Sequence, residues 1–115
     1  GKSKVMNVIG DVKNQTCIIV DDIIDSGGTI VNAAKALKER GAKEVYVYIT
    51  HGVLSGDAVK KIKNSVIKNL VITDTIDNGE KTNNVKNIEV LPISGLMGEA
   101  IKRISNSTSV SDLFK

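Results

Sequence analysis

The sequence predicts an α/β fold in which helices pack on a parallel β-sheet. Short β-branched runs alternate with segments whose apolar residues recur at helical spacing, which is typical of strand–helix–strand units. Aromatic residues make up only 3% of the chain, so Val, Ile, Leu and Ala must supply the core, as they do in parallel sheets. The predicted strands leave the sheet into polar residues, and ligands of such sheets bind outside the carboxyl ends of the strands.

Four apolar runs are predicted to form strands, and a fifth, Val5–Ile9, forms either an edge strand or a tether. The four strands are Thr16–Asp21, which we expect at the centre of the sheet, Glu44–Thr50, Asn69–Thr73 and Ile88–Pro92. Between the last two strands, residues 77–87 contain almost no apolar side chain and predict a mobile surface loop.

Three helices are predicted from apolar residues spaced three and four apart. The first follows the central strand and ends at Gly41, which acts as its C-cap. The second spans about Gly56–Ser65, and the third begins at a capping Ser94 and continues to about Ile104. The residues expected on buried faces are Ile30, Ala33, Ala34 and Leu37 in the first helix and Leu96, Met97, Ala100, Ile101 and Ile104 in the third.

Composition and charge exclude several classes of protein. The 115 residues suffice for a single domain, 1–115, with a Ser/Asn-rich tail over residues 105–115. The net charge of +3 comes from scattered basic residues and base-stacking aromatics are missing, so nucleic-acid binding is not indicated. No apolar stretch approaches the roughly 20 residues of a membrane span, and no signal core begins the chain, so we expect a cytoplasmic protein without membrane contact. The single cysteine, Cys17, excludes an internal disulfide.

The most informative stretch covers residues 16–29, where an apolar run ends in carboxylates and then in two glycines flanked by hydroxyl groups. Gly27 and Gly28 allow a tight turn whose backbone N–H groups face outward, and Asp25 or Ser26 is suited to cap a following helix. Free N–H groups at the start of a helix form a phosphate site. The stretch therefore predicts an anion-binding loop at the carboxyl edge of the sheet.

Carboxylates beside an anion site indicate a particular ligand. Asp21, Asp22 and Asp25 would repel a bare phosphate. A sugar phosphate removes the conflict, because Asp21 and Asp22 can accept hydrogen bonds from vicinal hydroxyls or hold a divalent cation while the Ser-Gly-Gly-Thr turn holds the phosphate. A second interpretation stays open, in which the paired carboxylates only begin a solvated loop.

Two further polar runs are expected at the same edge, Thr50-His51-Gly52 and Thr73-Asp74-Thr75. They contain His51, the only histidine of the chain. General-base chemistry and a structural hydrogen bond both suit that position, and we favour the structural role because no partner for proton transfer is evident.

The run Val20-Asp21-Asp22-Ile23-Ile24-Asp25-Ser26-Gly27-Gly28-Thr29 resembles the binding loop of type I phosphoribosyltransferases and of related proteins that make or use phosphoribosyl pyrophosphate. Three further matches narrow the resemblance to ribose-phosphate pyrophosphokinases. They are Gly10-Asp11-Val12, Tyr48-Ile49-Thr50-His51-Gly52-Val53-Leu54-Ser55-Gly56 and Ser109-Val110-Ser111-Asp112-Leu113-Phe114. The resemblance covers nearly the whole chain, and the transferases share neither the Thr-His-Gly motif nor the tail motif.

This resemblance implies a three-layer α/β sandwich of the type I phosphoribosyltransferase kind and a two-domain subunit of which the chain is the carboxy-terminal half. The implied enzyme transfers the β,γ-diphosphoryl group of Mg-ATP to the 1-hydroxyl of ribose 5-phosphate, giving phosphoribosyl pyrophosphate and AMP for nucleotide biosynthesis. Mg²⁺ is the implied cofactor, and ATP is implied to bind mainly to the missing amino-terminal domain. Full-length subunits are implied to form homo-oligomers, as hexamers.

Site residues are carried over by motif. Asp21 and Asp22 are implied to hold the ribose hydroxyls, together with Mg²⁺, while Asp25 braces the loop or approaches a sugar hydroxyl. The residues implied to form the loop around the 5-phosphate are Asp25, Ser26, Gly27, Gly28 and Thr29. In the tail, the residues that match a regulatory nucleotide and phosphate site between subunits are Ser109, Val110, Ser111 and Phe114.

The family's ATP site, catalytic histidine and basic loop match no residues of this chain, so no catalytic residue is assigned and we expect the chain to be inactive alone. Two alternatives stay open: a non-catalytic synthetase-associated regulatory module, and a phosphoribosyltransferase-like domain. The uninterrupted run from Ser26 to Thr29 favours a catalytic parent, because the associated proteins have an interrupted phosphate loop.

Overall fold

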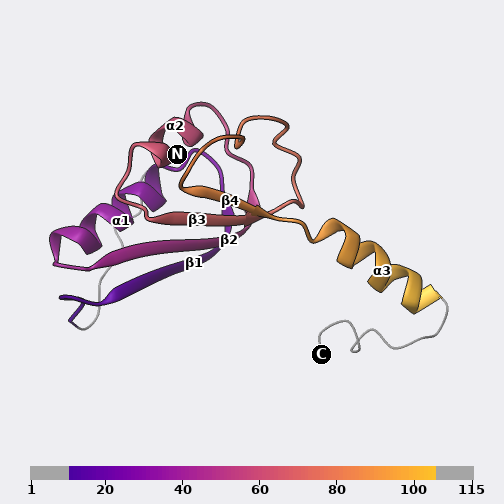
Figure 1. Cartoon of the computed structure of the whole chain (residues 1–115), viewed down its shortest axis with the longest axis horizontal. Helices are drawn as coiled ribbons and strands as arrows, with labels where there is room; N and C mark the ends of the chain where they lie inside the picture. The colour runs from indigo at the N-terminus through magenta and orange to yellow at the C-terminus, as the bar shows by residue number, and fades with distance from the viewer. Residues whose placement is uncertain (1–10, 106–115) are drawn as a thin grey trace.

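The structure is a computed structural model that describes residues 11–105, in which strands alternate with helices for most of the chain (Figure 1). The expected Val5–Ile9 strand and the tail beyond residue 105 lie outside the described residues. The elements are β1 (Thr16–Ile24), α1 (Gly28–Glu39), β2 (Glu44–Gly52), α2 (Ala58–Lys63), β3 (Asn69–Thr73), β4 (Ile88–Leu91) and α3 (Ser94–Ser105).

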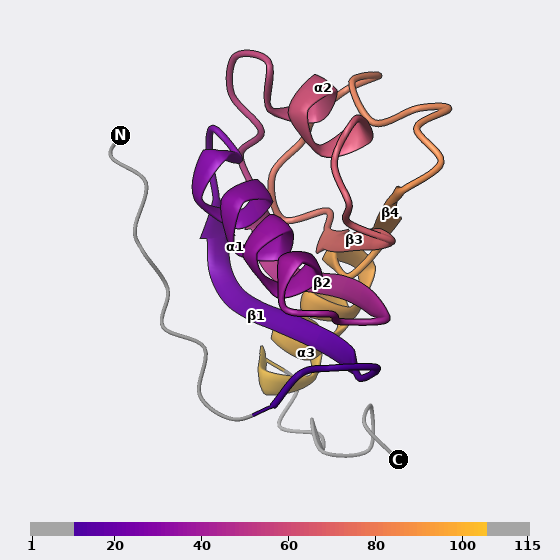
Figure 2. The same cartoon turned by 90° about the vertical axis from the view of Figure 1, so that its left-hand side faces the viewer.

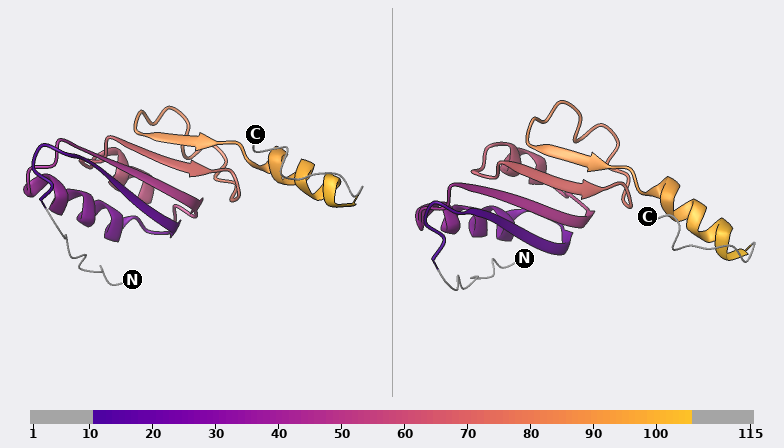
Figure 3. Two further views of the ribbon diagram at one scale, coloured as in Figure 1. Left: turned by 90° about the horizontal axis from the view of Figure 1, so that it is seen from below. Right: turned by 60° about the horizontal axis from the view of Figure 1, so that its bottom comes forward.

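The four strands form one parallel sheet in the order β1-β2-β3-β4, which confirms the predicted α/β class. All four run in one direction, so their carboxyl ends meet at the edge from which α3 departs (Figure 3). One detail of the prediction is wrong: the strand expected at the centre, β1, is an edge strand of the described sheet. It also continues past Asp21 to Ile24, so the two adjacent carboxylates belong to the strand itself.

Helices α1 and α2 lie side by side and cover one face of the sheet (Figure 2). Residues alternate along β2 and β3 between buried and less buried positions, as expected for strands with one covered face. The core between this face and the two helices is built from Ile19, Val45, Val47, Ile49, Leu70, Ile72, Ile30, Ala34, Ala58 and Ile62. Gly41 directly follows the C-cap of α1 at φ 93°, which confirms its predicted role at the end of that helix.

The opposite face of the sheet is open in the described part of the chain. Ile18 and Val20 are 55% and 75% exposed, and Tyr48 on the neighbouring strand is 42% exposed. A shallow, mostly apolar hollow of about 550 Å³ lies over these strands. The apolar run at the start of β1 is typical of a strand buried on both faces, but only its Ile19 side enters the described core.

Helix α3 forms where it was predicted, but the predicted burial of its apolar stripe is wrong at two positions. Leu96 is 37% exposed and Ile104 is 67% exposed. The physical reason is that α3 extends away from the sheet beyond the end of β4 instead of packing on it (Figures 1 and 3). The side chains of Met97 and Ile101 lie outside the described residues.

The segment between β3 and β4 is a surface loop that is held at several points. The Asn78 side-chain amide donates to the Gly52 carbonyl at 2.9 Å, and that of Asn87 donates to the carbonyls of Ile62 and Ile67. The remaining predicted helix, α2, is shorter at both ends than the sequence pattern indicated. Within residues 11–105, none of the helices has the length and apolar content needed to cross a bilayer.

Candidate functional site

The carboxyl end of β1 brings two carboxylates to the edge of the sheet. Asp21 and Asp22 are both exposed, and the Asp22 backbone N–H donates to Asp21 Oδ1 at 2.8 Å. Both carboxylates line one cavity at the end of the strand. They can therefore accept hydrogen bonds from two different hydroxyl groups of one ligand.

The loop Asp25-Ser26-Gly27 connects β1 to α1, and Gly27 is the N-cap of the helix. Gly27 adopts the left-handed conformation at φ 83°, which costs a residue with a Cβ atom roughly 1–2 kcal/mol. The prediction that Asp25 or Ser26 caps α1 is wrong, because no side chain caps this helix. Asp25 instead accepts a hydrogen bond from the hydroxyl of Ser55 in the loop after β2.

The first turn of α1 offers unpaired donors. Its backbone N–H groups have no helical carbonyl to donate to, and the positive end of the helix dipole lies among them. Gly28 is the first residue of this turn, and a Cβ atom built there would meet no atom within 4 Å apart from its chain neighbours and the backbone of its own helix. The fold itself therefore does not need a glycine at position 28, whereas a ligand that approaches the backbone does.

A cavity of about 300 Å³ joins the strand end to the helix start, at the lower end of the range for small-ligand sites. Six of the seven predicted ribose 5-phosphate residues line it, together with three isoleucines. The predicted residues in the lining are Asp21, Asp22, Asp25, Ser26, Gly27 and Thr29. No lysine or arginine is among the lining residues in the described part of the chain, so only N–H groups and hydroxyls oppose the charge of an anion there.

The side chains around the cavity do not form a complete metal-binding site. Among residues 11–105, no group of three or more His, Cys, Asp or Glu side chains is placed to hold an ion. Mg²⁺ is commonly held by one or two carboxylates with water and substrate oxygens completing the shell, and Asp21 and Asp22 fit that lesser role.

The second and third polar runs meet at the same edge of the sheet, as the parallel strands require. His51 Nδ1 lies 2.8 Å from Thr75 Oγ1, and Thr73 Oγ1 donates to the Thr50 carbonyl at 2.5 Å. The hydrogen bond of His51 agrees with the structural role that we favoured over general-base chemistry. Gly52 has a packing role, because a Cβ atom there would lie 2.6 Å from Ile72 Cδ1.

Comparison with known proteins places this geometry in a family. The family described as "Phosphoribosyl synthetase-associated domain" matches residues 1–115. The chain belongs to this family. The resemblance noted from the sequence motifs is thereby confirmed at the level of the family.

Curated relatives of this phosphoribosyl synthetase-associated domain are named ribose-phosphate pyrophosphokinase. One from Hyphomonas neptunium is 61% identical over 114 residues, and one from Bradyrhizobium diazoefficiens is 59% identical over 114 residues; each alignment covers 99% of the chain but 36% of the relative. The chain thus spans about a third of the length of these relatives. The crystal structure of phosphoribosylpyrophosphate synthetase from Mycobacterium smegmatis superposes with a TM-score of 0.78 at 36% identity, over 92% of this chain and 35% of that one.

Sequence reasoning missed Ser55, which contacts the loop of this synthetase-associated domain from 30 residues away along the chain. A signal existed, since residues that directly follow β2 must lie beside those that follow β1 in a parallel pair. The predicted regulatory residues Ser109, Val110, Ser111 and Phe114 lie outside the described residues, and their role stays a prediction.

Proposed function

We propose that the chain is the ribose 5-phosphate-binding part of a ribose-phosphate pyrophosphokinase and corresponds to the carboxy-terminal half of its subunit. The relatives of 52–61% identity that carry this name support a catalytic parent over a non-catalytic module. Because the chain spans 36% of such relatives, the complete reaction belongs to a longer protein. That reaction transfers diphosphate from Mg-ATP to the 1-hydroxyl of ribose 5-phosphate.

The observation that carries the proposal is the empty space at Gly28 beside the cavity of carboxylates. Gly28 places no side chain of its own beside the first-turn N–H groups, so a phosphate can approach them closely. At the other end of the same cavity, Asp21 and Asp22 repel a second anionic group and accept hydrogen bonds from hydroxyls. A ligand with a phosphate at one end and vicinal hydroxyls at the other satisfies both ends.

In this arrangement the residues of the chain bind and orient the sugar phosphate. Ser26 and Thr29 line the cavity beside the N–H groups, so their hydroxyls can donate to phosphate oxygens. Asp21 and Asp22 fix the ring through its hydroxyls and thereby set the direction in which the 1-hydroxyl points. Mg²⁺, held by these carboxylates together with substrate and water, would supply positive charge near the reacting phosphates.

Phosphoryl transfer depends on cations that neutralise developing charge. No lysine or arginine of the described residues lines the cavity, and we expect side-chain cations and the ATP site to be supplied by the rest of the subunit. We therefore expect the 115-residue chain to bind ribose 5-phosphate without producing phosphoribosyl pyrophosphate. Assembly into homo-oligomers and a cytoplasmic location are part of the same proposal.

Titration calorimetry with ribose 5-phosphate in the presence of Mg²⁺ tests the binding role. We expect the wild-type chain to bind and Gly28→Val to bind at least about 10-fold more weakly, because its side chain occupies the approach to the N–H groups. Gly95→Val is the matched control, since Gly95 lies in the first turn of α3 and also faces open space. Equal binding by wild type and Gly28→Val would show that the phosphate lies elsewhere.

A further inference from the structure

The loop that follows β2, residues 53–57, runs along the loop that carries Asp25 and holds its backbone. The N–H groups of Val53 and Leu54 donate to the Ile24 carbonyl at 2.9 and 3.4 Å. The N–H group of Ser55 donates to the Asp25 carbonyl at 3.0 Å. The last carbonyl of β1 and the first carbonyl of the cavity loop are thus both fixed by the neighbouring loop.

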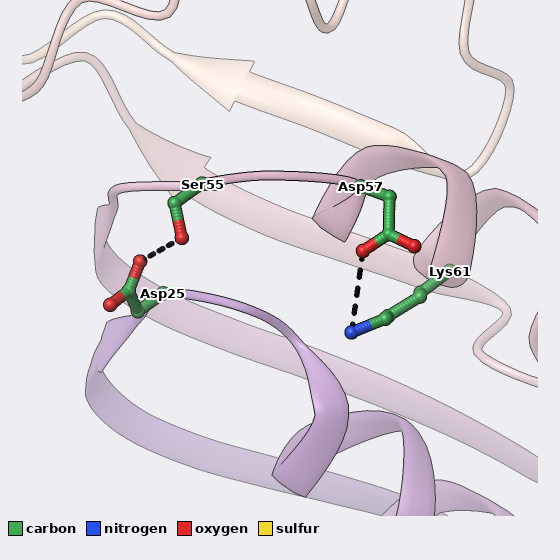
Figure 4. Close-up of polar contacts among 4 residues, drawn as sticks. All are labelled: Asp25, Ser55, Asp57 and Lys61. Atoms are coloured by element: carbon green, nitrogen blue, oxygen red, sulfur yellow. Dashed lines mark hydrogen bonds and ion pairs between the residues drawn. The ribbon is translucent and has the colours of Figure 1, made fainter. Parts of the chain in front are cut away.

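Ser55 also holds the side chain of Asp25. Its hydroxyl donates to Asp25 Oδ1, and Figure 4 shows the two side chains pointing toward one another from the two loops. Ser55 therefore contacts one residue twice, at the carbonyl and at the carboxylate. This double contact fixes the direction in which the chain enters the Ser26-Gly27 turn and so the direction of the N–H groups beyond it.

The residues around Ser55 form a firm support. Leu54 is fully buried and adopts φ 53°, a left-handed conformation that a bulky side chain keeps only where its surroundings impose it. The Leu54 carbonyl accepts a hydrogen bond from Lys81 Nζ at 3.2 Å. On the other side of Ser55, the N–H group of the fully buried Ala58 donates to the Ser55 carbonyl at 3.1 Å. Ser55 cannot shift without moving these two buried side chains.

We propose that Ser55 is a positioning residue of the ribose 5-phosphate site: through Asp25, it holds the loop in the conformation that binds phosphate before the ligand arrives. This inference rests on the proposed function. The physical gain is preorganisation, because a loop that is already ordered loses less conformational freedom on binding. Ser55 itself does not line the cavity and acts through Asp25.

Three variants of the 115-residue chain test the proposal. Ser55→Ala removes the hydroxyl, Ser55→Thr keeps a hydroxyl, and Asp57→Asn is the control in the same loop. Asp57 pairs with Lys61 at 3.4 Å, is largely exposed and has no contact with Asp25 (Figure 4). Such exposed pairs contribute little to stability.

Two measurements are made on each variant. Amide hydrogen exchange without ligand reports the protection of the Ser55 and Val31 N–H groups, which donate to the Asp25 and Gly27 carbonyls of the loop, and calorimetry with ribose 5-phosphate and Mg²⁺ reports binding. We expect Ser55→Ala to exchange these amides about 5- to 10-fold faster and to bind about 5- to 10-fold more weakly, as for the loss of one typical hydrogen bond. Ser55→Thr should keep both values within about 2-fold of those of the wild type, and Asp57→Asn should match the wild type.

The outcomes separate this inference from the proposed function. If the wild type binds ribose 5-phosphate and Ser55→Ala binds equally well, the positioning role is wrong while the proposed function stands. If the wild type does not bind, the proposed function is wrong and the role of Ser55 in binding ends with it, whereas the exchange rates still decide whether Ser55 orders the loop. Failure of Ser55→Thr to restore either value would overturn the hydroxyl contact as the cause.

Discussion

The two adjacent glycines of the cavity loop should respond in opposite directions to the same substitution. At Gly27 the backbone is left-handed, at φ 83°, and an added Cβ atom would meet Ala58 at ordinary contact distances of 3.6–3.7 Å. Gly27→Ala therefore adds backbone strain of roughly 1–2 kcal/mol without a steric clash, and a stiffer unfolded chain offsets about 0.4–1 kcal/mol of it. We expect a net loss of up to about 1.5 kcal/mol in the free energy of unfolding.

Gly28→Ala should stabilise the chain. Gly28 has a helical position and an open space beside it, so alanine fits without strain and gains about 0.4–1 kcal/mol from the unfolded state. Urea denaturation measures both values, and heat denaturation should place the two melting temperatures several degrees apart. If Gly28→Ala destabilises the chain as Gly27→Ala does, the fold needs the glycine at position 28, and the argument that this position is kept open for a ligand fails.

Three further outcomes follow from the same geometry. Ile72→Ala in the covered core should cost about 2–5 kcal/mol of unfolding free energy, while Ile18→Ala on the open face should cost less than about 1 kcal/mol, both by urea denaturation. The hydrogen bond from Tyr46 to Glu44, with burial, raises the pKa of Tyr46 above its usual 10.0. This hydrogen bond therefore stabilises the fold fully below pH 10, and the stabilisation is lost as the pH rises through the raised pKa. Alkaline absorbance titration should show one tyrosine that ionises late, and this late step should be missing in Tyr46→Phe. Incubation of the chain with Mg-ATP and ribose 5-phosphate should yield no AMP, and sustained AMP formation would contradict the proposed division of the active site.

Most of the fold follows from periodicity in the sequence. The strand Asn69–Thr73 has the predicted bounds, and the buried face of α1 carries Ile30, Ala33 and Ala34, as their spacing indicated. Periodicity shows which residues share a face, but not whether another element covers that face. This is why Ile104 was expected in a core and is 67% exposed, and why the start of β1 was predicted at the centre of the sheet.

The candidate site could be predicted from the sequence as far as its residues are close together along the chain. Six predicted residues line one cavity because they lie within nine positions of each other, across a single strand–loop–helix junction. The cap of α1 could not be predicted from the local sequence, in which both Asp25 and Ser26 are favoured cap residues. A contact from a distant loop decided it, since the Ser55 hydroxyl engages the Asp25 carboxylate and the left-handed Gly27 takes the cap position.

The cavity has carboxylates at one end and N–H groups at the other, and this distribution of charge affects which ligands it can bind. In the proposed function, phosphate would be bound by N–H groups and hydroxyls, which select for close fit, while the three lining carboxylates disfavour any anion that brings no hydroxyl groups to them. Cations in the same place would bind inorganic phosphate and sugar phosphate alike, so their absence from the described lining favours selection. The proposed transfer of diphosphate nevertheless requires cations, which we expect from outside the described cavity. The proposed function thus assigns selection of the sugar and stabilisation of the transferred charge to different parts of a longer subunit.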